Sequence, residues 1–321
     1  MTLACRLIRA SHLAYAICEN EERLVDPLPT PGELEAIGCV KSDLAIRQPA
    51  GREYTDAFLF GRTLDNAYIL AFRGTLDRSD PGGDEFFRVL LDWLGDGNIA
   101  LCTGGEMAGR VHRGFLDSLD HLWSDVEQLL SPAVQAEIRS GTPLYVTGHS
   151  KGGAVAQLAA YRLARQGVTP AAVHTFAAPR SGNAEFAAAF DATFPAALRF
   201  EYRDDMVPHL PAATGAWVSV LRGLRAINLT FPVETAQVTA DSRVSHALED
   251  LLARLESDLP TYASCGQLQF IDWDDKIQPD SRELTIQRNL SLAKKLAELK
   301  LSEVIGDHGS QSGYGRVLCA G

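Results

Sequence analysis

The sequence predicts an α/β fold, with a mostly parallel central sheet and helices on both of its faces. Short apolar runs bounded by turn residues, such as 67–72, have the length and composition of buried strands. Segments with apolar residues three and four positions apart, such as 115–139, predict helices between these runs. Strands that alternate with helices along a chain are typical of a parallel sheet covered on both faces.

The expected elements follow one another without any repeat or low-complexity tract. A Pro-rich stretch at 27–31 is expected to follow the first helix. In order, we expect a helix at 2–19, strands at 57–60 and 67–72, a helix at 115–139, a strand at 143–147, a helix at 154–161, strands at 172–177 and 198–202, a helix at 243–256, a strand at 268–271 and a charged helix at 281–300.

Length and composition are those of one large globular domain spanning 1–321. The chain has 321 residues, of which 46% are hydrophobic and 22% are charged, so it has enough apolar mass for a sizeable core. The formal net charge is −11, which disfavours nucleic acid and anionic membrane surfaces as partners.

Six widely spaced cysteines form no CxxC pair, so the sequence gives no support to a zinc or thioredoxin-like site. The even count would allow disulfides, but the wide and irregular spacing favours buried, reduced thiols, which we expect here. Arg6, Arg9 and His12 interrupt the apolar core that a signal peptide would need, and no window of about 18 uncharged apolar residues predicts a transmembrane helix. The default expectation is therefore a cytoplasmic location, with secretion left open.

Ser150 is the candidate nucleophile, because it lies in the pattern Gly-x-Ser-x-Gly between the expected strand 143–147 and the expected helix 154–161. A sharp strand-to-helix turn leaves no room for side chains two residues before and after the serine, and both positions are glycine. The backbone N–H of Lys151 would then hold an oxyanion, while its side chain is expected at the surface or lining the site. The alternative is an incidental serine in a Gly-rich turn.

Five further motifs, in order along the chain, accompany this serine. They are Phe72-Arg73-Gly74-Thr75, Asp92-Trp93-Leu94-Gly95-Asp96, Val111-His112-Arg113-Gly114-Phe115, Phe176-Ala177-Ala178-Pro179-Arg180-Ser181-Gly182-Asn183 and Asp205-Met206-Val207-Pro208-His209-Leu210-Pro211. With them the sequence resembles the class 3 lipases, a family of α/β-hydrolases that includes the filamentous-fungal triacylglycerol lipases. The resemblance covers about 55–211 well and 262–318 more thinly.

The resemblance also suggests which carboxylate is the catalytic acid. A serine hydroxyl needs a base, and the base needs an orienting carboxylate. Asp204 and Asp205 both follow the expected strand 198–202, and the family motif aligns on Asp205. We therefore favour Asp205, and we expect Asp204 to be a solvated turn residue or to provide a supporting hydrogen bond.

The base should follow the acid, since α/β-hydrolases carry nucleophile, acid and histidine in that order. His209, His246 and His308 meet this condition. We expect a structural role for His209, which lies only four residues after Asp205. His308 lies in a loop that resembles the terminal histidine loop of the family, so we favour it over His246, which lies in a helical pattern.

The resemblance implies two further features near the site. Thr75 would supply the second oxyanion donor, through its N–H group and its hydroxyl. Residues 76–97, which follow directly, would form a lid that opens at a lipid surface, the alternative being an ordinary core helix. The segment between Asp205 and His308 is longer than in the fungal lipases that the sequence resembles. Residues 275–302 account for most of the difference, and we interpret them as a helical insertion.

Together these features predict a serine carboxylic ester hydrolase that uses a Ser150–His308–Asp205 triad, forms an acyl-enzyme and needs no cofactor or metal. Acylglycerols are the expected substrates, with transient contact to a lipid interface. A phospholipase A1 or a general esterase would use the same site. A catalytically silent, lipase-like binding protein is a further alternative, against which the complete set of candidate residues argues.

Overall fold

The computed structural model of the protein describes residues 1–15, 29–47, 56–75, 100–211, 262–297, 303 and 306–320. The expected helix at 243–256, which contains His246, lies outside these residues. So do the lid expected at 76–97 and the last residues of the helix expected at 281–300.

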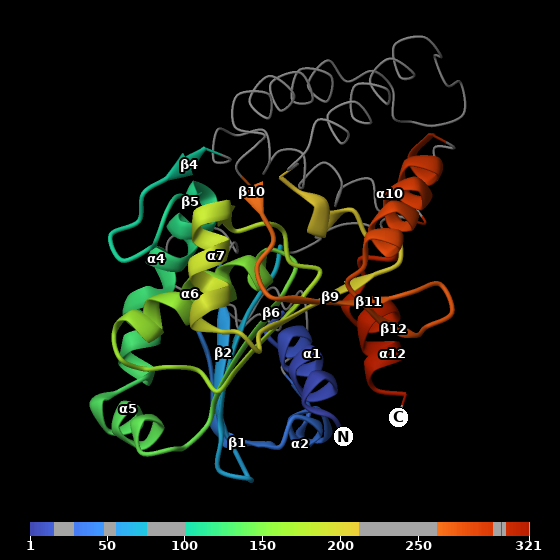
Figure 1. The fold of residues 1–321 in the computed structure, drawn as a ribbon. Helices are drawn as coiled ribbons and strands as arrows, with labels where there is room; N and C mark the ends of the chain where they lie inside the picture. Colours follow the sequence, from blue (N-terminus) through green and yellow to red (C-terminus); the bar gives the residue numbers. More distant parts are fainter. Residues whose placement is uncertain are drawn as a thin grey trace, which may run out of the picture.

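An eight-stranded sheet forms the centre of the described structure (Figure 1). Its strand order is β1-β2-β3-β6-β7-β9-β11-β12. The four pairings from β3 through β11 are parallel, and the pairings β1–β2, β2–β3 and β11–β12 at the two edges are antiparallel. The strands are β1 (Cys39–Arg47), β2 (Phe58–Thr63), β3 (Tyr68–Phe72), β6 (Leu144–His149), β7 (Ala172–Phe176), β9 (Leu198–Tyr202), β11 (Gln267–Ile271) and β12 (Ile277–Pro279).

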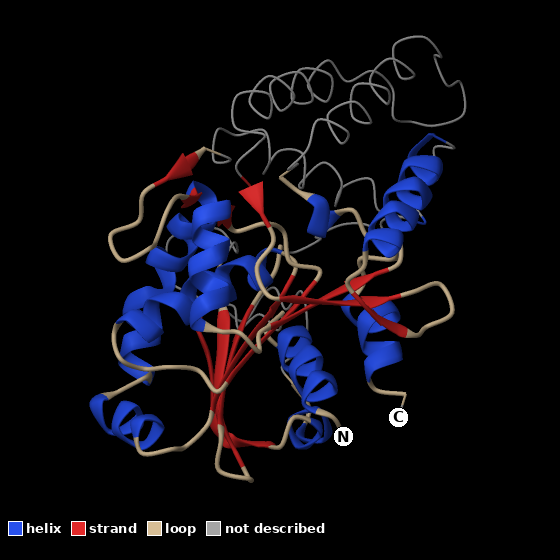
Figure 2. Ribbon diagram, viewed as in Figure 1, coloured by secondary structure: helices blue, strands red, loops and turns tan. Residues whose placement is uncertain are grey.

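Helices cover both faces of this sheet, as the alternation of elements predicts (Figure 2). One face packs against α4 (Arg113–Leu129), α6 (Lys151–Arg165) and α7 (Ala184–Thr193). The other packs against α1 (Leu3–Leu13), α2 (Pro31–Ala36) and α12 (Arg316–Leu318). Successive side chains of β3 enter the two cores in turn, because side chains alternate along a strand. The α/β prediction is confirmed.

A second, smaller sheet lies beside α4 and α7 and has the order β10-β8-β5-β4. Its strands have two residues each and pair antiparallel. They are β4 (Leu101–Cys102), β5 (Val111–His112), β8 (Gly182–Asn183) and β10 (Tyr262–Ala263).

The single helix expected at 115–139 is wrong, because the structure has two helices there. Helix α4 ends at Leu129, and α5 runs from Pro132 to Arg139. Ser131 caps α5 by accepting a hydrogen bond from the Val134 N–H, and Pro132 occupies its first position. Proline has no N–H group and is favoured at the start of a helix, so Ser131-Pro132 begins a new helix rather than continuing the old one.

The expectation that all six cysteines are reduced is also wrong. Cys5 of α1 and Cys319, directly after α12, form a disulfide across a sequence separation of 314 residues. Their Cα atoms lie 5.0 Å apart because α1 packs against the C-terminal helix. The spacing of the cysteines along the chain does not predict this pairing. Cys102 and Cys265 are free thiols, as expected.

Residues 282–297 form helix α10 (Arg282–Ala297), which packs on β9 and β11. Leu284 contributes to a small core with Leu268 and Phe270. The Arg288 guanidinium forms a buried ion pair with Glu201 of β9 and lies 4.6 Å from the centre of the Phe270 ring. The neighbouring strand β12 was not expected from the sequence. That 275–302 is an insertion stays a prediction.

Candidate active site

Ser150 occupies a sharp turn between β6, which ends at His149, and α6, which begins at Lys151. Its backbone has φ 58° and ψ −135°, a conformation that non-glycine residues rarely adopt. A Cβ atom on Gly148 would lie 2.1 Å from the Gly152 carbonyl oxygen, and one on Gly152 would lie 2.2 Å from the Phe72 carbonyl oxygen. The turn therefore requires glycine at both positions.

The end of β3 lies directly against this turn. A Cβ atom on Gly74 would lie 3.0 Å from the Ser150 Cβ and 2.7 Å from the His149 carbonyl oxygen. Thr75, the candidate oxyanion donor, follows at once and is half-buried. Lys151 is the first residue of α6, and the first N–H groups of a helix point out of its N-terminal end, which here begins directly after Ser150.

The side chain of Lys151 does not lie at the surface, which was one of the two positions expected for it. It is buried, and its ammonium group lies 2.7 Å from Asp56 Oδ1. Burial alone would raise the pKa of the Asp56 carboxyl, but the nearby Lys151 charge and hydrogen bonds lower it below its ordinary value. Lys151 thus anchors the start of α6 to the segment before β2.

Asp205 and His308 lie in contact, although 103 residues separate them. His308 Nδ1 lies 2.9 Å from Asp205 Oδ2 and 3.0 Å from Oδ1, and both side chains are buried. The turn after β9 presents Asp205, and its Oδ1 also accepts a hydrogen bond of 3.0 Å from the Val207 N–H. A carboxylate that accepts from an imidazole N–H holds the ring in one orientation, with its other nitrogen directed away.

His149 links His308 to the serine turn. The His149 ring lies 4.7 Å, centre to centre, from the His308 ring, and its Nε2 donates a 2.8 Å hydrogen bond to the His308 carbonyl oxygen. Its Nδ1 therefore accepts the hydrogen bond from the Tyr15 hydroxyl at 2.9 Å. Burial and the neighbouring His308 lower the pKa of His149 well below its ordinary value, so this ring stays neutral. The residue directly before Ser150 thus holds the backbone of His308.

Tyr314 is a residue to which the sequence analysis gave no role. It lies in the π-helical segment η2 (Ser310–Gly315), and its hydroxyl donates a 2.7 Å hydrogen bond to Asp205 Oδ2. The same hydroxyl accepts from the Tyr202 N–H at 3.0 Å. Burial and the Asp205 carboxylate raise the pKa of Tyr314 well above its ordinary value, so the phenol keeps its proton. The only sequence signal was an aromatic residue shortly after His308.

Replacing Tyr314 with phenylalanine should leave Asp205 with one donor fewer and the buried Tyr202 N–H without its acceptor. We expect the free energy of unfolding to fall by about 1–3 kcal/mol, the cost of leaving a buried polar group unsatisfied. Chemical denaturation of wild type and Tyr314→Phe measures this loss. The matched control is Tyr145→Phe, at a half-buried position of β6. A Tyr314→Phe protein as stable as wild type would contradict the role of this hydroxyl.

His209 and Asp204, the alternatives to His308 and Asp205, contact other residues than the Asp205–His308 pair. His209 is buried, and burial together with Arg180 lowers its pKa to about 3. Its carbonyl oxygen accepts a 2.6 Å hydrogen bond from Arg180. Asp204 is not the solvated turn residue that the sequence suggested, because it is 1% exposed and contacts Lys295 and Trp273. These contacts agree with the other expectation for Asp204, which was that it provides a supporting hydrogen bond.

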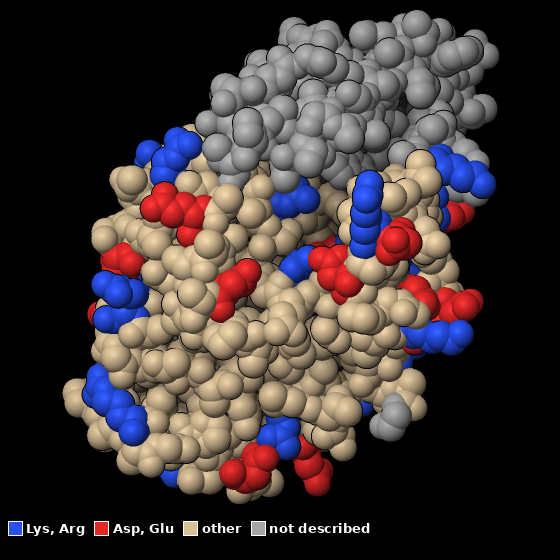
Figure 3. Space-filling model, in the orientation of Figure 1, with Lys and Arg blue, Asp and Glu red and all other residues tan. Residues whose placement is uncertain are grey.

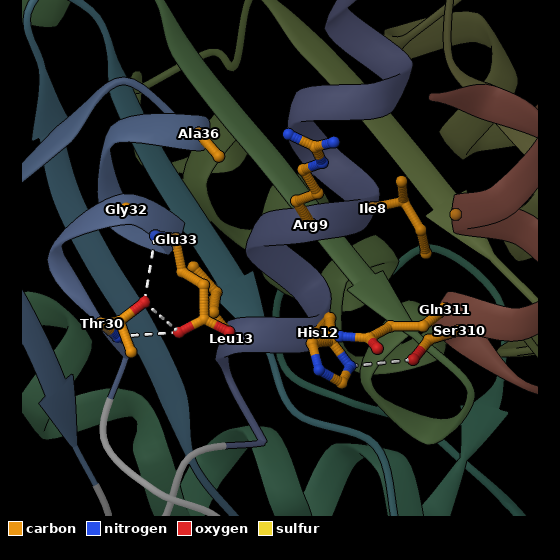
Figure 4. Close-up of a pocket in the computed structure, with 11 residues that line it drawn as sticks. Ile8, Arg9, His12, Leu13, Thr30, Gly32, Glu33, Ala36, Ser310 and Gln311 are labelled. Atoms are coloured by element: carbon orange, nitrogen blue, oxygen red, sulfur yellow. Dashed lines mark hydrogen bonds between the residues drawn. The ribbon is translucent and has the colours of Figure 1, made fainter. Parts of the chain in front are cut away.

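A cavity of about 360 Å³ lies on the α1 side of the sheet, between α1, α2 and η2 (Figure 4). His12 reaches across one end, with its Nδ1 3.1 Å from the Ser310 hydroxyl. The cavity is lined by Ile8, Arg9, His12, Leu13, Thr30, Gly32, Glu33, Ala36, Ser310, Gln311 and Gly315. It borders the segment that follows His308 but contains none of the candidate catalytic residues.

The charged side chains on the face seen in Figure 3 are of both signs and interspersed. Within the described ranges, no helix is both long enough and apolar enough to cross a membrane. In the same ranges, no group of three or more His, Cys, Asp or Glu side chains could hold a metal ion.

The model of the family "Lipase (class 3)" matches residues 69–215. The curated relatives include a lipase from Caenorhabditis elegans, 38% identical over 106 residues, which cover 32% of this chain and 29% of the relative. A secreted mono- and diacylglycerol lipase from Fusarium solani is 37% identical over 124 residues, which cover 37% of this chain and 35% of the relative. A secreted mono- and diacylglycerol lipase from Penicillium cyclopium is 30% identical over 193 residues, which cover 59% of this chain and 56% of the relative. The chain thus spans between about a third and about half of the length of these relatives.

Solved structures resemble the fold over more of the chain. The Rhizomucor miehei lipase in complex with its propeptide has a TM-score of 0.59 at 18% identity, covering 97% of this chain and 79% of that one. The protein MDLA from Penicillium cyclopium has a TM-score of 0.57 at 21% identity, and the match covers 89% of this chain and 87% of that one. At these identities the likeness concerns the fold, which is that of the fungal lipases.

Proposed function

We propose that the chain, whose residues 69–215 match the model of the class 3 lipases, is a serine carboxylic ester hydrolase that acts on acylglycerols. The observation that carries this proposal is the buried Asp205–His308 pair, held by His149 next to the Ser150 turn. Nucleophile, base and orienting carboxylate are the three groups that acyl transfer through a serine needs.

The proposed reaction has two halves. His308 Nε2 takes the proton of the Ser150 hydroxyl while the serine oxygen attacks the ester carbonyl carbon. The N–H groups of Lys151 and Thr75 stabilise the negative charge on the carbonyl oxygen. The protonated His308 gives its proton to the departing alcohol, which leaves an acyl-enzyme, and a water molecule activated by His308 then releases the acid. Asp205 stabilises the imidazolium throughout.

Acylglycerols are the proposed substrates because two of the relatives described above are named mono- and diacylglycerol lipases. The test compares hydrolysis of mono-, di- and triacylglycerols with that of a phosphatidylcholine and a soluble short-chain ester. Preferential hydrolysis of acylglycerols supports the proposal. Release of the sn-1 acid from the phospholipid alone would assign a phospholipase A1, and turnover of the soluble ester alone a general esterase.

Transient contact with a lipid interface is part of the proposal and concerns the lid expected at 76–97, outside the described residues. The same assays test it if substrate concentration is raised through the solubility limit. A lid that opens at a lipid surface gives a jump in activity at that limit. A smooth saturation curve through the limit contradicts it.

The disulfide bears on where the protein works. Disulfides persist in oxidising compartments and are rare in the cytosol, and two of the relatives are named as secreted. We therefore propose an oxidising compartment in place of the default cytoplasmic location. Alkylation of the protein from its native source, followed by mass measurement with and without prior reduction, tests this. Alkylation of Cys5 and Cys319 without reduction would contradict it.

A further inference from the structure

We propose that Lys295 of helix α10 is a positioning residue for the Asp205–His308 pair, acting by joining the two chain segments that present them. This role rests on the proposed function, because it concerns the alignment of the proposed base and its carboxylate. Lys295 lies in the segment 275–302, which the sequence analysis interpreted as an insertion without assigning it any function.

Two of the carboxylates that Lys295 contacts belong to the immediate chain neighbours of the pair, and the third, that of Glu303, lies 3.5 Å away and is 51% exposed. Its Nζ lies 2.9 Å from Asp204 Oδ2 and 3.3 Å from Asp307 Oδ2. Asp204 precedes Asp205, and Asp307 precedes His308. Asp307 Oδ2 also accepts a 3.3 Å hydrogen bond from the Asp204 N–H. One ammonium group therefore bridges the turn after β9 and the segment leading to His308.

Charge explains why these segments need a cation between them. The Asp204 side chain is fully buried and that of Asp307 is 12% exposed, so the two carboxylates that share the Lys295 ammonium have little solvent screening. Burial acts to lower the pKa of Lys295, but Asp204 and Asp307 raise it above its ordinary value, which keeps the ammonium charged at neutral pH. Without that charge, the two carboxylates would repel each other and separate the segments.

The helix that carries Lys295 has its own anchors. Arg288 forms the ion pair with Glu201, and Leu284 packs in the small core with Phe270. On the loop before β12, the Trp273 indole N–H donates to Asp204 Oδ2 at 3.0 Å, so Asp204 keeps one partner if Lys295 is replaced. A change at Lys295 therefore removes the bridging charge while leaving other contacts that hold α10 to the sheet.

The experiment measures kcat and KM on a soluble short-chain ester, and the rate at which a fluorophosphonate labels Ser150. We expect Lys295→Met to lower kcat and the labelling rate by about 10- to 100-fold, the usual effect of losing a group that orients an active-site residue. KM should stay within about twofold, because Lys295 contacts the residues beside the base and its carboxylate rather than the serine turn. Lys295→Arg, which keeps the charge, should retain most of the activity.

Lys276→Met is the matched control. Lys276 is 70% exposed, and among the described residues it forms one ion pair, a 3.7 Å contact with Asp274, which is 78% exposed. This variant should keep wild-type kcat and labelling rate. A wild-type rate in Lys295→Met as well would overturn the positioning role.

A second variant separates lost charge from lost packing. Asp307→Asn in the Lys295→Met background removes the charge that the lysine neutralised, while its side-chain oxygen can still accept from the Asp204 N–H. We expect it to restore kcat by about fivefold or more, a non-additive effect of residues in contact. No recovery, at an unchanged melting temperature, would overturn the electrostatic role. A wild-type protein that neither hydrolyses the ester nor reacts with the fluorophosphonate would overturn the proposed function itself, and this role with it.

Discussion

Replacing Ser150 with alanine should lower kcat for ester hydrolysis by about 10⁴- to 10⁶-fold and abolish fluorophosphonate labelling. Removal of a serine nucleophile leaves only binding and oxyanion stabilisation to accelerate the reaction. Rates of a purified variant on a soluble ester, with mass measurement after labelling, test this. Ser140→Ala, at an exposed serine that ends helix α5, is the control and should behave as wild type. Residual activity within about tenfold of wild type would rule out Ser150 as the nucleophile.

The same position makes a separate prediction about stability. Ser150 has a positive φ of 58°, which costs about 1–3 kcal/mol for a residue with a side chain. Glycine accepts this conformation but loses about 0.5–1 kcal/mol in unfolded-state entropy. Ser150→Gly should therefore be more stable than Ser150→Ala by about 1 kcal/mol, measured by chemical denaturation. An alanine variant at least as stable as the glycine variant would mean that the turn is not strained.

Replacing Asp205 with asparagine should lower kcat by about 10⁴-fold, the second large effect. Each carboxylate oxygen accepts hydrogen bonds, from the Val207 N–H on one side and from the Tyr314 hydroxyl on the other. An amide puts an NH₂ group against one of these donors or against His308 Nδ1, so the imidazole loses the acceptor that selects its tautomer.

The measurement is the pH dependence of kcat for Asp205→Asn beside that of Asp117→Asn, a control at an exposed aspartate of α4. The control should match wild type at every pH. If Asp205→Asn kept more than about a tenth of wild-type kcat, another carboxylate would have to orient the base.

The sequence was informative where local sterics decide the structure. Gly148 and Gly152 flank a serine between a strand and a helix, and only a tight turn explains glycine at both positions. The break at Ser131-Pro132 was equally local and could have been predicted from the cap and the proline. The apolar periodicity of 115–129 does not itself end at this break, so periodicity alone predicts one continuous helix.

What the sequence could not provide are contacts between distant segments. Tyr314 meets Asp205 across 109 residues, and Tyr15 meets His149 across 134. No spacing rule connects such pairs, because the sheet order and the packing of α1 and η2 bring them together. The pairing of Asp205 with His308 was expected only through family resemblance, and its supporting hydrogen bonds became visible only in three dimensions.

The bond between Cys5 and Cys319 closes residues 5–319 into a covalent ring. A protease that cuts the backbone once anywhere inside this ring opens it without releasing either piece. Tyr15 and His308 each form a hydrogen bond with one of the two ring nitrogens of His149. Tyr15 lies shortly after Cys5 in the sequence, and His308 lies shortly before Cys319. A single nick between them thus leaves both in the same covalent molecule, and the fragments separate only after reduction.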